Sequence, residues 1–213
     1  MVDIDFVLFD LDGVLVDACE WHYEALNMAL KEHGYPEISR NAHESTYNGL
    51  PTRIKLQMMN VPKEIAEKIN EEKQRHTIDV IRKNATLMPE KIELHQHLKS
   101  LDIKIACVTN SIRDTAIEML TATGQIPFID LIVSNEMVNR NKPHPDCYNL
   151  AIGKMNANPK KCICVEDSMF GLQSAKSSLA EYIWKVDNST KVTRESYTNF
   201  VDGLYYYKEL CRF

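Results

Sequence analysis

Short apolar runs alternate with amphipathic stretches along most of the chain. The first run, Phe6–Phe9, is bounded by polar residues, which predicts a short buried strand. Further runs rich in β-branched and aliphatic residues predict strands at 103–108, 129–133, 162–165 and 182–186. Residues spaced as on one helix face predict helices at 89–101, 113–123, 145–155 and 169–178. Such alternation with short connections is typical of an α/β fold whose parallel sheet is covered on both faces.

The stretch from about 18 to 86 interrupts this alternation, because it contains helical patterns and no convincing strand. Helices are predicted at 19–33, 52–60 and 63–83, with Gly34 as a helix stop and a polar segment before the second helix. We therefore expect an α-helical cap at 17–86, inserted into a core formed by 1–16 and 87–213. The tail around 205–207 is expected to be a final edge element or a packed terminus, with no role assigned.

Two carboxylates, separated by one residue, follow the first predicted strand. Asp10 is expected at the carboxyl end of the strand, where open parallel sheets bind ligands, and Asp12 lies in the loop just beyond. Gly13 permits backbone angles that other residues resist. A fixed carboxylate can attack phosphorus, and a second carboxyl nearby can give and take the proton. The other interpretation of Asp-x-Asp-Gly is a polar turn after a strand.

Polar residues also follow two other predicted strands, and parallel strands bring these ends to one edge. Thr109 and Asn110 follow one strand, and Glu166 and Asp167 follow another. Two carboxylates about 4 Å apart repel by roughly 4 kcal/mol at an effective dielectric near 20, so a shared site favours a dication. All-oxygen ligands beside a phosphate are typical of Mg²⁺. Helix capping is the other interpretation of both motifs.

Lys142 lies between predicted strands in Asn-Lys-Pro-His-Pro, where prolines stiffen the loop and fix the direction of the side chain. A lysine there can neutralise phosphoryl charge and restrain the nucleophile. A solvated surface lysine is the other interpretation.

Composition narrows the classes of function. The 213 residues are 44% hydrophobic, with a formal net charge of -5, which supports a sizeable core and argues against a nucleic-acid partner. We find no signal-peptide pattern and no apolar run long enough to span a membrane. Cys162 and Cys164 could suggest a metal, but no second pair supports one, and we expect the six scattered cysteines to be reduced thiols of a cytoplasmic protein.

The motifs Asp10-x-Asp12-Gly-Val, Thr109-Asn-Ser, Lys142-Pro-x-Pro and Glu166-Asp167-Ser-x-x-Gly, in this order, resemble the haloacid dehalogenase superfamily. The nearest likeness is the branch of phosphatases and β-phosphoglucomutases that carry a small helical cap. The resemblance covers nearly the whole chain. It implies a Rossmann-like three-layer core and phosphoryl transfer to or from a small phosphorylated metabolite such as a sugar or polyol phosphate, with one Mg²⁺ per chain.

The resemblance also assigns roles to residues. Asp10 is the nucleophile, and Asp12 is the acid/base, with its carbonyl on the metal. The phosphoryl group is held by Thr109, Asn110, Ser111 and Lys142. The metal site comprises Asp10, Asp12, Glu166 and Asp167, with Asp167 the more direct ligand of the last two.

Cap residues distinguish hydrolysis from mutase chemistry. His22 falls where the mutase has a histidine that contacts the acid/base, although related phosphatases often carry one too. In the segment at Gly49, the mutase's arginine is replaced by Thr52, with Arg53 one place on, and its neighbouring lysine by Asn48. The grip on a second phosphate is therefore weakened, and we favour a phosphatase over the mutase.

Two other classes fit less well. A phospho-receiver module pairs acids, a Thr and a Lys, but it is shorter and has no acid/base two residues after its acceptor. A nicotinamide enzyme is disfavoured because no G-x-G-x-x-G follows the first strand. We expect a monomer with no nucleic-acid or membrane partner.

Overall fold

The structure is a computed structural model, and it describes residues 3–47 and 50–210. The chain divides into two compact units, one formed by Met1–Asp17 with Thr86–Phe213 and the other by Ala18–Ala85. These boundaries differ by one residue, at each junction, from those expected for the core and the cap. We describe each unit by itself, using the names core and cap.

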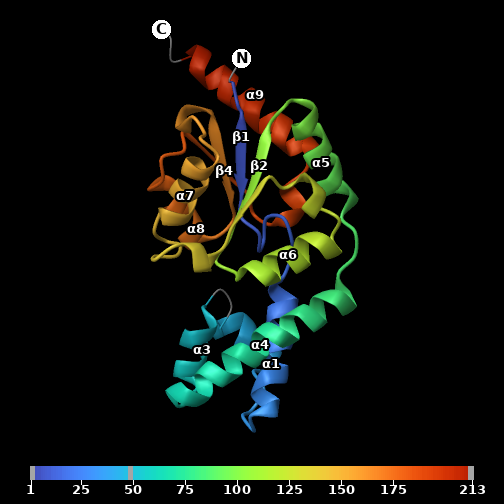
Figure 1. The fold of residues 1–213 in the computed structure, drawn as a ribbon, viewed down its shortest axis with the longest axis vertical. Helices are drawn as coiled ribbons and strands as arrows, with labels where there is room; N and C mark the ends of the chain where they lie inside the picture. Colours follow the sequence, from blue (N-terminus) through green and yellow to red (C-terminus); the bar gives the residue numbers. More distant parts are fainter. Residues whose placement is uncertain (1–2, 48–49, 211–213) are drawn as a thin grey trace. The chain divides into compact units, whose positions relative to one another are not determined.

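The core is built on one five-stranded parallel sheet with strand order β3-β2-β1-β4-β5 (Figure 1). The strands are β1 (Phe6–Phe9), β2 (Lys104–Val108), β3 (Leu131–Val133), β4 (Cys162–Glu166) and β5 (Tyr182–Lys185). Phe9 of the central strand lies opposite Cys107 of β2 and Val165 of β4, so these strands end at nearly the same level. The predicted α/β fold with a parallel sheet is confirmed.

Helices cover both faces of this sheet. They are α5 (Pro89–Ser100), α6 (Arg113–Ala122), α7 (Asp146–Lys154), α8 (Met169–Lys176) and α9 (Arg194–Leu210), with short 3₁₀ turns at Ile126–Phe128, Asn135–Met137, Pro159–Lys161 and Ser189–Lys191. Because neighbouring strand residues point to opposite faces, Leu8 packs with Tyr148 of α7, whereas Phe9 contacts His95 of α5, with ring centroids 5.8 Å apart. This gives the three layers that were expected.

Of the two alternatives expected for the tail, an edge element or a packed terminus, the structure has the second, because the tail forms the helix α9, which packs on β5. Its residues Tyr197 and Phe200 pack on Trp184 of β5, and the Phe200 ring stacks on the indole at 5.6 Å between centroids. Burial of these aromatic side chains holds the helix against the core.

The cap consists of helices α1 (Cys19–Glu32), α2 (Arg40–Ala42), α3 (Thr52–Met58) and α4 (Lys63–Asn84), with a π-helical turn at His43–Tyr47. Apolar residues of α1, α3 and α4, among them Leu30, Leu56 and Ile69, form a separate buried cluster. The polar segment after Gly34 contains α2 and the π-helical turn, which the pattern did not predict. The Ser39 hydroxyl starts α2 by accepting a hydrogen bond from Ala42 N at 3.2 Å.

The cysteines and the helices can be compared with what the composition predicted. Cys19, Cys107, Cys147, Cys162 and Cys164 are free thiols, and in the described part of the chain neither Cys162 nor Cys164 belongs to a group that could hold a metal. Within residues 3–47 and 50–210, every helix is too short or too polar to traverse a lipid bilayer.

Candidate active site

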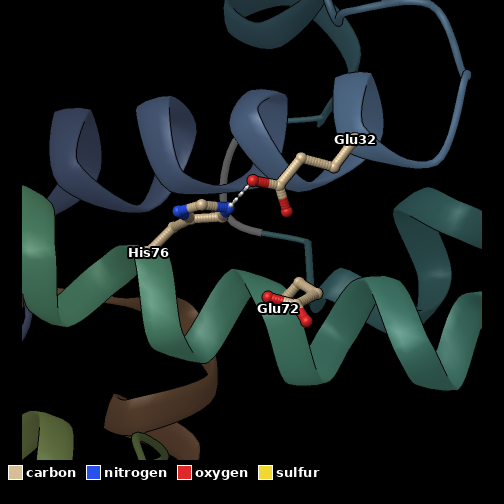
Figure 2. Close-up of side chains that lie close together, drawn as sticks. All are labelled: Glu32, Glu72 and His76. Atoms are coloured by element: carbon tan, nitrogen blue, oxygen red, sulfur yellow. Dashed lines mark ion pairs between the residues drawn. The ribbon is translucent and has the colours of Figure 1, made fainter.

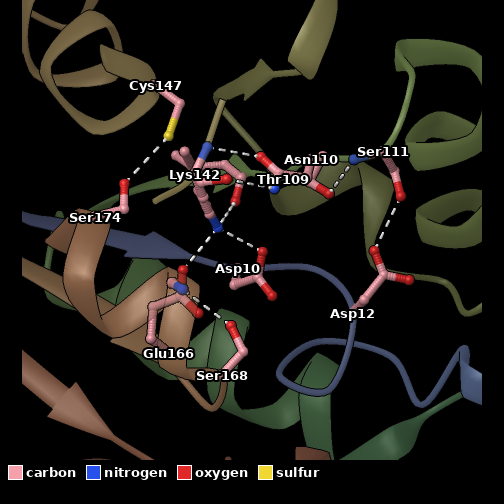
Figure 3. A network of polar contacts seen from close by, with 12 residues as sticks. Asp10, Asp12, Thr109, Asn110, Ser111, Lys142, Cys147, Glu166, Ser168 and Ser174 are labelled. Carbon is pink, nitrogen blue, oxygen red and sulfur yellow. Dashed lines mark hydrogen bonds and ion pairs between the residues drawn. The ribbon is translucent and has the colours of Figure 1, made fainter. Parts of the chain in front are cut away.

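The carboxyl ends of three neighbouring strands bring the predicted site residues of the core to one edge of the sheet (Figure 3). Asp10 directly follows β1, and its backbone N–H donates to Val165 O at 3.0 Å, which continues the ladder. Thr109 follows β2, and its backbone N–H donates to Val133 O at 2.9 Å. Glu166 is the last residue of β4. The sequence therefore predicted this juxtaposition correctly.

Lys142 connects the two strand-end carboxylates. Its Nζ lies 2.6 Å from Oδ1 of Asp10 and 2.7 Å from Oε1 of Glu166, and it also donates to Val108 O at 2.7 Å. An ammonium has three donors, so these contacts use all of them. The Asn110 side chain fixes the loop, because its Oδ1 accepts from Lys142 N at 3.0 Å and its Nδ2 donates to Lys142 O at 3.3 Å. Lys142 thus restrains the carboxylate of Asp10.

Burial dominates the electrostatics of this group. It raises the pKa of the Asp10 carboxyl well above its usual range, with Lys142 opposing and Glu166 and Asp12 adding to the rise. Burial alone would lower the pKa of Lys142, but Asp10 and Glu166 together hold it above its ordinary value. The ammonium therefore stays charged and compensates only part of the carboxylate charge.

A metal fits at the same edge. One carboxylate oxygen each from Asp10, Glu166 and Asp167 lies within 4.8 Å of the others. Glu166 Oε2 and Asp167 Oδ1 are buried without a hydrogen-bond partner, and burial, followed by Glu166, raises the pKa of Asp167 to about 6. Three carboxylates and the Lys142 ammonium sum to a charge of -2 when all are ionised. Hard oxygen ligands, orphaned oxygens and this charge suit Mg²⁺.

Two glycines allow the carboxylates to approach this closely. A Cβ on Gly13 would lie 2.0 Å from Asp167 Oδ2, and the residue has φ +87°, a region that favours glycine. A Cβ on Gly171 would lie 1.9 Å from Glu166 Oε2. The sequence motif contained both glycines, but only the structure shows that each makes room for a metal-site oxygen.

Asp12 differs from the other acids. It was expected to offer the metal its backbone carbonyl rather than its carboxylate, and the three-residue group of side-chain oxygens does not test that expectation. Its Oδ2 accepts a hydrogen bond from the Ser111 hydroxyl at 3.0 Å, and Ser111 N donates to Thr109 Oγ1 at 2.9 Å. The Ser111 hydroxyl is thus one partner of the Asp12 carboxylate, which also acts electrostatically on Asp10 and Asp167. Contacts of Thr109 and Ser111 with a phosphoryl group stay a prediction.

Sequence reasoning missed Tyr148. This fully buried tyrosine on α7 donates from its hydroxyl to Glu166 Oε1 at 2.6 Å, and the Lys142 ammonium lies 4.9 Å from the centre of its ring. Its position on the apolar face of the predicted helix was the only feature of the sequence that could have indicated a buried tyrosine near the site, but the same position is typical of an ordinary core residue.

The predicted cap residues are described within the cap alone. His22, on α1, has its Nδ1 3.0 Å from Nζ of Lys73, a buried residue of α4 that the sequence did not single out. Thr52 is half-buried and Arg53 exposed, both in the first turn of α3. Gly49 lies outside the described residues, as does Asn48.

Comparisons with known proteins agree with this geometry. A family model described as haloacid dehalogenase-like hydrolase matches residues 7–185. A phosphorylated carbohydrates phosphatase of Thermotoga maritima is 30% identical over 193 residues, 87% of each chain. The pyrophosphatase PpaX of Bacillus pumilus is 28% identical over 195 residues, covering 86% of this chain and 85% of that protein.

Solved structures include one with the alternative chemistry. The β-phosphoglucomutase of Clostridium difficile superimposes with a TM-score of 0.71 at 25% identity, covering 93% of this chain and 99% of that chain. Similarity therefore extends over most of the chain, both to phosphatases and to a mutase.

Proposed function

This chain belongs to the haloacid dehalogenase-like hydrolases, and on that premise we propose that it releases inorganic phosphate from a small phosphorylated metabolite, a sugar or polyol phosphate. The observation that carries the proposal is the Lys142 ammonium held between Asp10 and Glu166, with Asp12 two residues further along the chain. The arrangement supplies a restrained carboxylate and a separate carboxyl for proton transfer.

In the proposed reaction, a carboxylate oxygen of Asp10 bonds to phosphorus while the bond from phosphorus to the leaving oxygen breaks. Asp12 gives its proton to that leaving oxygen. It then takes a proton from the water that attacks phosphorus, which breaks the bond to Asp10 and releases inorganic phosphate. The Ser111 hydroxyl, 3.0 Å from Asp12 Oδ2, orients the proton carrier. Thr109 and Asn110 are proposed to hold the phosphoryl oxygens through the hydroxyl, the amide and the following helix start.

Asp10, Glu166 and Asp167 would hold one Mg²⁺ per chain, with Asp167 and the orphaned oxygen of Glu166 the best-prepared ligands. The family pattern adds the backbone carbonyl of Asp12. When bound, the ion supplies positive charge that offsets the phosphoryl charge and the carboxylate repulsion. Lys142 keeps the carboxylate of Asp10 from rotating away.

Hydrolysis is favoured over the mutase reaction because of the cap sequence. A mutase must hold a second phosphate firmly, and an unpaired dianion in a closed site is costly. The expected cap cations are replaced by Asn48 and Thr52, with Arg53 next in sequence. The Thermotoga relative, whose name gives phosphorylated carbohydrates as substrates, supports the same choice.

The test is incubation with β-glucose 1-phosphate, a trace of the 1,6-bisphosphate and Mg²⁺, beside a panel of sugar and polyol phosphates. We expect free phosphate to accumulate from at least one substrate, with no faster appearance of glucose 6-phosphate. Glucose 6-phosphate that accumulates much faster than phosphate would establish the mutase and make His22 and Arg53 the residues to vary next. Absence of both products across the panel would contradict the proposed substrate class.

We further propose that the protein works as a cytoplasmic monomer. The free, mostly buried thiols support a reducing compartment. Gel filtration with light scattering checks the monomer, because a dimer would elute at twice the chain mass of 24.5 kDa.

A further inference from the structure

Three side chains in the cap bring a thiol, an imidazole and an ammonium together, and the proposed phosphoryl chemistry uses none of them. Sγ of Cys19 lies 3.6 Å from Nε2 of His43. Lys55 is the third member, and it interacts electrostatically with Cys19 and with His43. The residues come from α1, the π-helical turn and α3, so their meeting is a product of the cap fold rather than of sequence proximity.

Lys55 is the unusual member of this group. It is only 9% exposed, and among the described residues it has no hydrogen bond or ion pair with a carboxylate. Burial lowers the pKa of its ammonium, and the negative form of Cys19 acts in the opposite direction. A buried charge without a counter-charge is costly. Because the attraction is mutual, the ammonium stabilises a thiolate at Cys19 as much as the thiolate stabilises the ammonium.

The backbone of α1 also stabilises a thiolate at Cys19. Cys19 is the first residue of α1, where free N–H groups and the helix dipole favour negative charge. His43 is 4% exposed and its Nε2 contacts the sulfur, and because burial and then the charge of Lys55 lower the pKa of the imidazole, His43 acts as a neutral hydrogen-bond partner of Cys19. A helix N-terminus and a neighbouring lysine are surroundings that lower the pKa of a thiol and favour the thiolate.

Carboxylates near the group could oppose this effect. Glu20 follows Cys19, but both of its oxygens accept hydrogen bonds from the Arg40 guanidinium. Glu44, in the π-helical turn, acts on His43, and its side chain is exposed, so water screens its charge. Arg40 therefore compensates Glu20, and Lys55 is the cation that acts on Cys19.

We propose that Cys19 is a reactive thiol and the site at which small disulfides modify this protein. The Cys19 thiolate attacks one sulfur of the disulfide, a new S–S bond forms, and the other half leaves as a thiolate that takes a proton from water. Cys19 is half-buried and accessible to such a reagent, whereas Cys107, Cys147, Cys162 and Cys164 are buried. Burial also raises the pKa of the Cys162 thiol to about 11.

The first test measures the rate of iodoacetamide alkylation at Cys19 against pH in the full chain, by peptide mass spectrometry. We expect a half-maximal rate below pH about 8, under the value near 8.5 of an unperturbed cysteine. Lys55→Met should move the midpoint up by about one pH unit and slow the reaction at pH 7 several-fold, while Lys55→Arg should restore it.

Lys63→Met is the matched control, because the Lys63 side chain is 90% exposed on the same unit. Lys55→Met removes a buried charge, so it should fold, and a melting curve verifies this. An alkylation midpoint of 8.5 or higher would overturn the proposal. Equal midpoints for Lys55→Met and Lys63→Met would overturn it as well.

The second test uses oxidised glutathione as the disulfide. Peptide mapping should find the mixed disulfide at Cys19, reversed by dithiothreitol and absent from Cys19→Ser. Modification confined to other cysteines, or no modification, would contradict the proposal. Neither experiment depends on phosphatase activity, so each outcome is independent of the proposed function.

Discussion

Within residues 3–47 and 50–210, two groups of metal-ligating side chains could each hold a metal by proximity alone, one in the core and one in the cap. In the core, Asp10, Glu166 and Asp167 are mostly buried, and two of their oxygens have no hydrogen-bond partner. In the cap, the group consists of Glu32, Glu72 and His76 (Figure 2). Comparing the two shows which properties make a carboxylate cluster functional.

In the cap group, both carboxylates already have partners from the protein. His76 Nε2 lies 2.9 Å from Glu32 Oε1, and Arg75 contacts Glu72 at 2.7 Å and Glu32 at 3.4 Å. Both glutamates are exposed enough for water to solvate them. The hydrogen bond with His76, followed by the charges of His76 and Arg75, lowers the pKa of Glu32. Nδ1 of His76 is buried without a hydrogen-bond partner, but among the described residues no carboxylate oxygen of this group is left buried and unpartnered, which distinguishes it from the core group.

In the core group, the protein supplies too little positive charge to balance the carboxylates. Its only ammonium, among the described residues, is that of Lys142, and it carries one charge against three carboxylates. Water reaches little of the site, so the remaining repulsion is weakly screened. Two properties therefore distinguish the proposed Mg²⁺ site: an excess of buried negative charge, and carboxylate oxygens without hydrogen-bond partners. The number of acidic residues alone does not distinguish it.

The largest expected effect comes from removing the nucleophile. Asp10→Asn should lower kcat by about 10³-fold or more, because the amide nitrogen cannot attack phosphorus and water must do so unaided. Glu32→Gln in the cap should leave kcat within about twofold. A folded Asp10→Asn enzyme with near-normal phosphate release would refute the assignment of Asp10.

A pair of glycine variants in two core helices tests whether the carboxylate oxygens of the core cluster require a residue without a Cβ beside them. Gly171→Ala should destabilise the protein by about 1–3 kcal/mol and weaken Mg²⁺ binding, since its Cβ would displace the buried carboxylate of Glu166. Gly153→Ala meets no atom within 4 Å and should stabilise α7 by about 0.5–1 kcal/mol. Urea unfolding measures both, and equal effects would contradict the close-packing argument.

A smaller effect is expected on the pH dependence of stability, for which the two buried histidines differ. His76 has a carboxylate partner, whereas His95, fully buried in the core, has the neutral amide of Gln125 with Nε2 and Oε1 3.0 Å apart. Burial lowers the pKa of His95 to about 4. The unfolded chain takes up this proton near pH 6.5 and the folded chain does not. Stability from neutral His95 is therefore complete above pH 6.5 and is lost as pH falls towards 4.

The measurement is the free energy of unfolding in EDTA at pH 7 and pH 5, for the wild type and His95→Gln. The wild type should lose about 1–2 kcal/mol more than the variant between these two pH values. An equal loss of unfolding free energy in the wild type and in His95→Gln would show that His95 does not cause the loss of stability at acid pH. Taking the difference removes the opposite contribution of Asp167, whose raised pKa makes the metal-free protein more stable as pH falls through 6.

The sequence predicted which core side chains lie at one edge of the sheet, because strand ends in a parallel sheet determine where side chains meet. Asp10, Thr109 and Glu166 needed no side-chain detail, since the topology alone brings them together. The use of all three Lys142 donors and the role of Tyr148 could not be predicted, because both depend on rotamers inside a packed core.

The cap was harder to predict for a related reason. Its helices have the expected spacing, but the buried positions of Lys55 and Lys73 run against the usual exposure of lysine. The helical turns at 40–47 contain no apolar period, and Ser39 starts them through a local side-chain hydrogen bond. Capping of this kind is easily taken for a polar loop.

Calorimetric titration of Mg²⁺ into the wild type, Asp167→Asn and Glu72→Gln is the most direct test of the claim that the core cluster is the metal site. We predict one Mg²⁺ per chain for the wild type and for Glu72→Gln with the same affinity. We also predict at least tenfold weaker binding for Asp167→Asn. Undiminished binding to Asp167→Asn, together with a loss in Glu72→Gln, would place the metal in the cap and contradict the account.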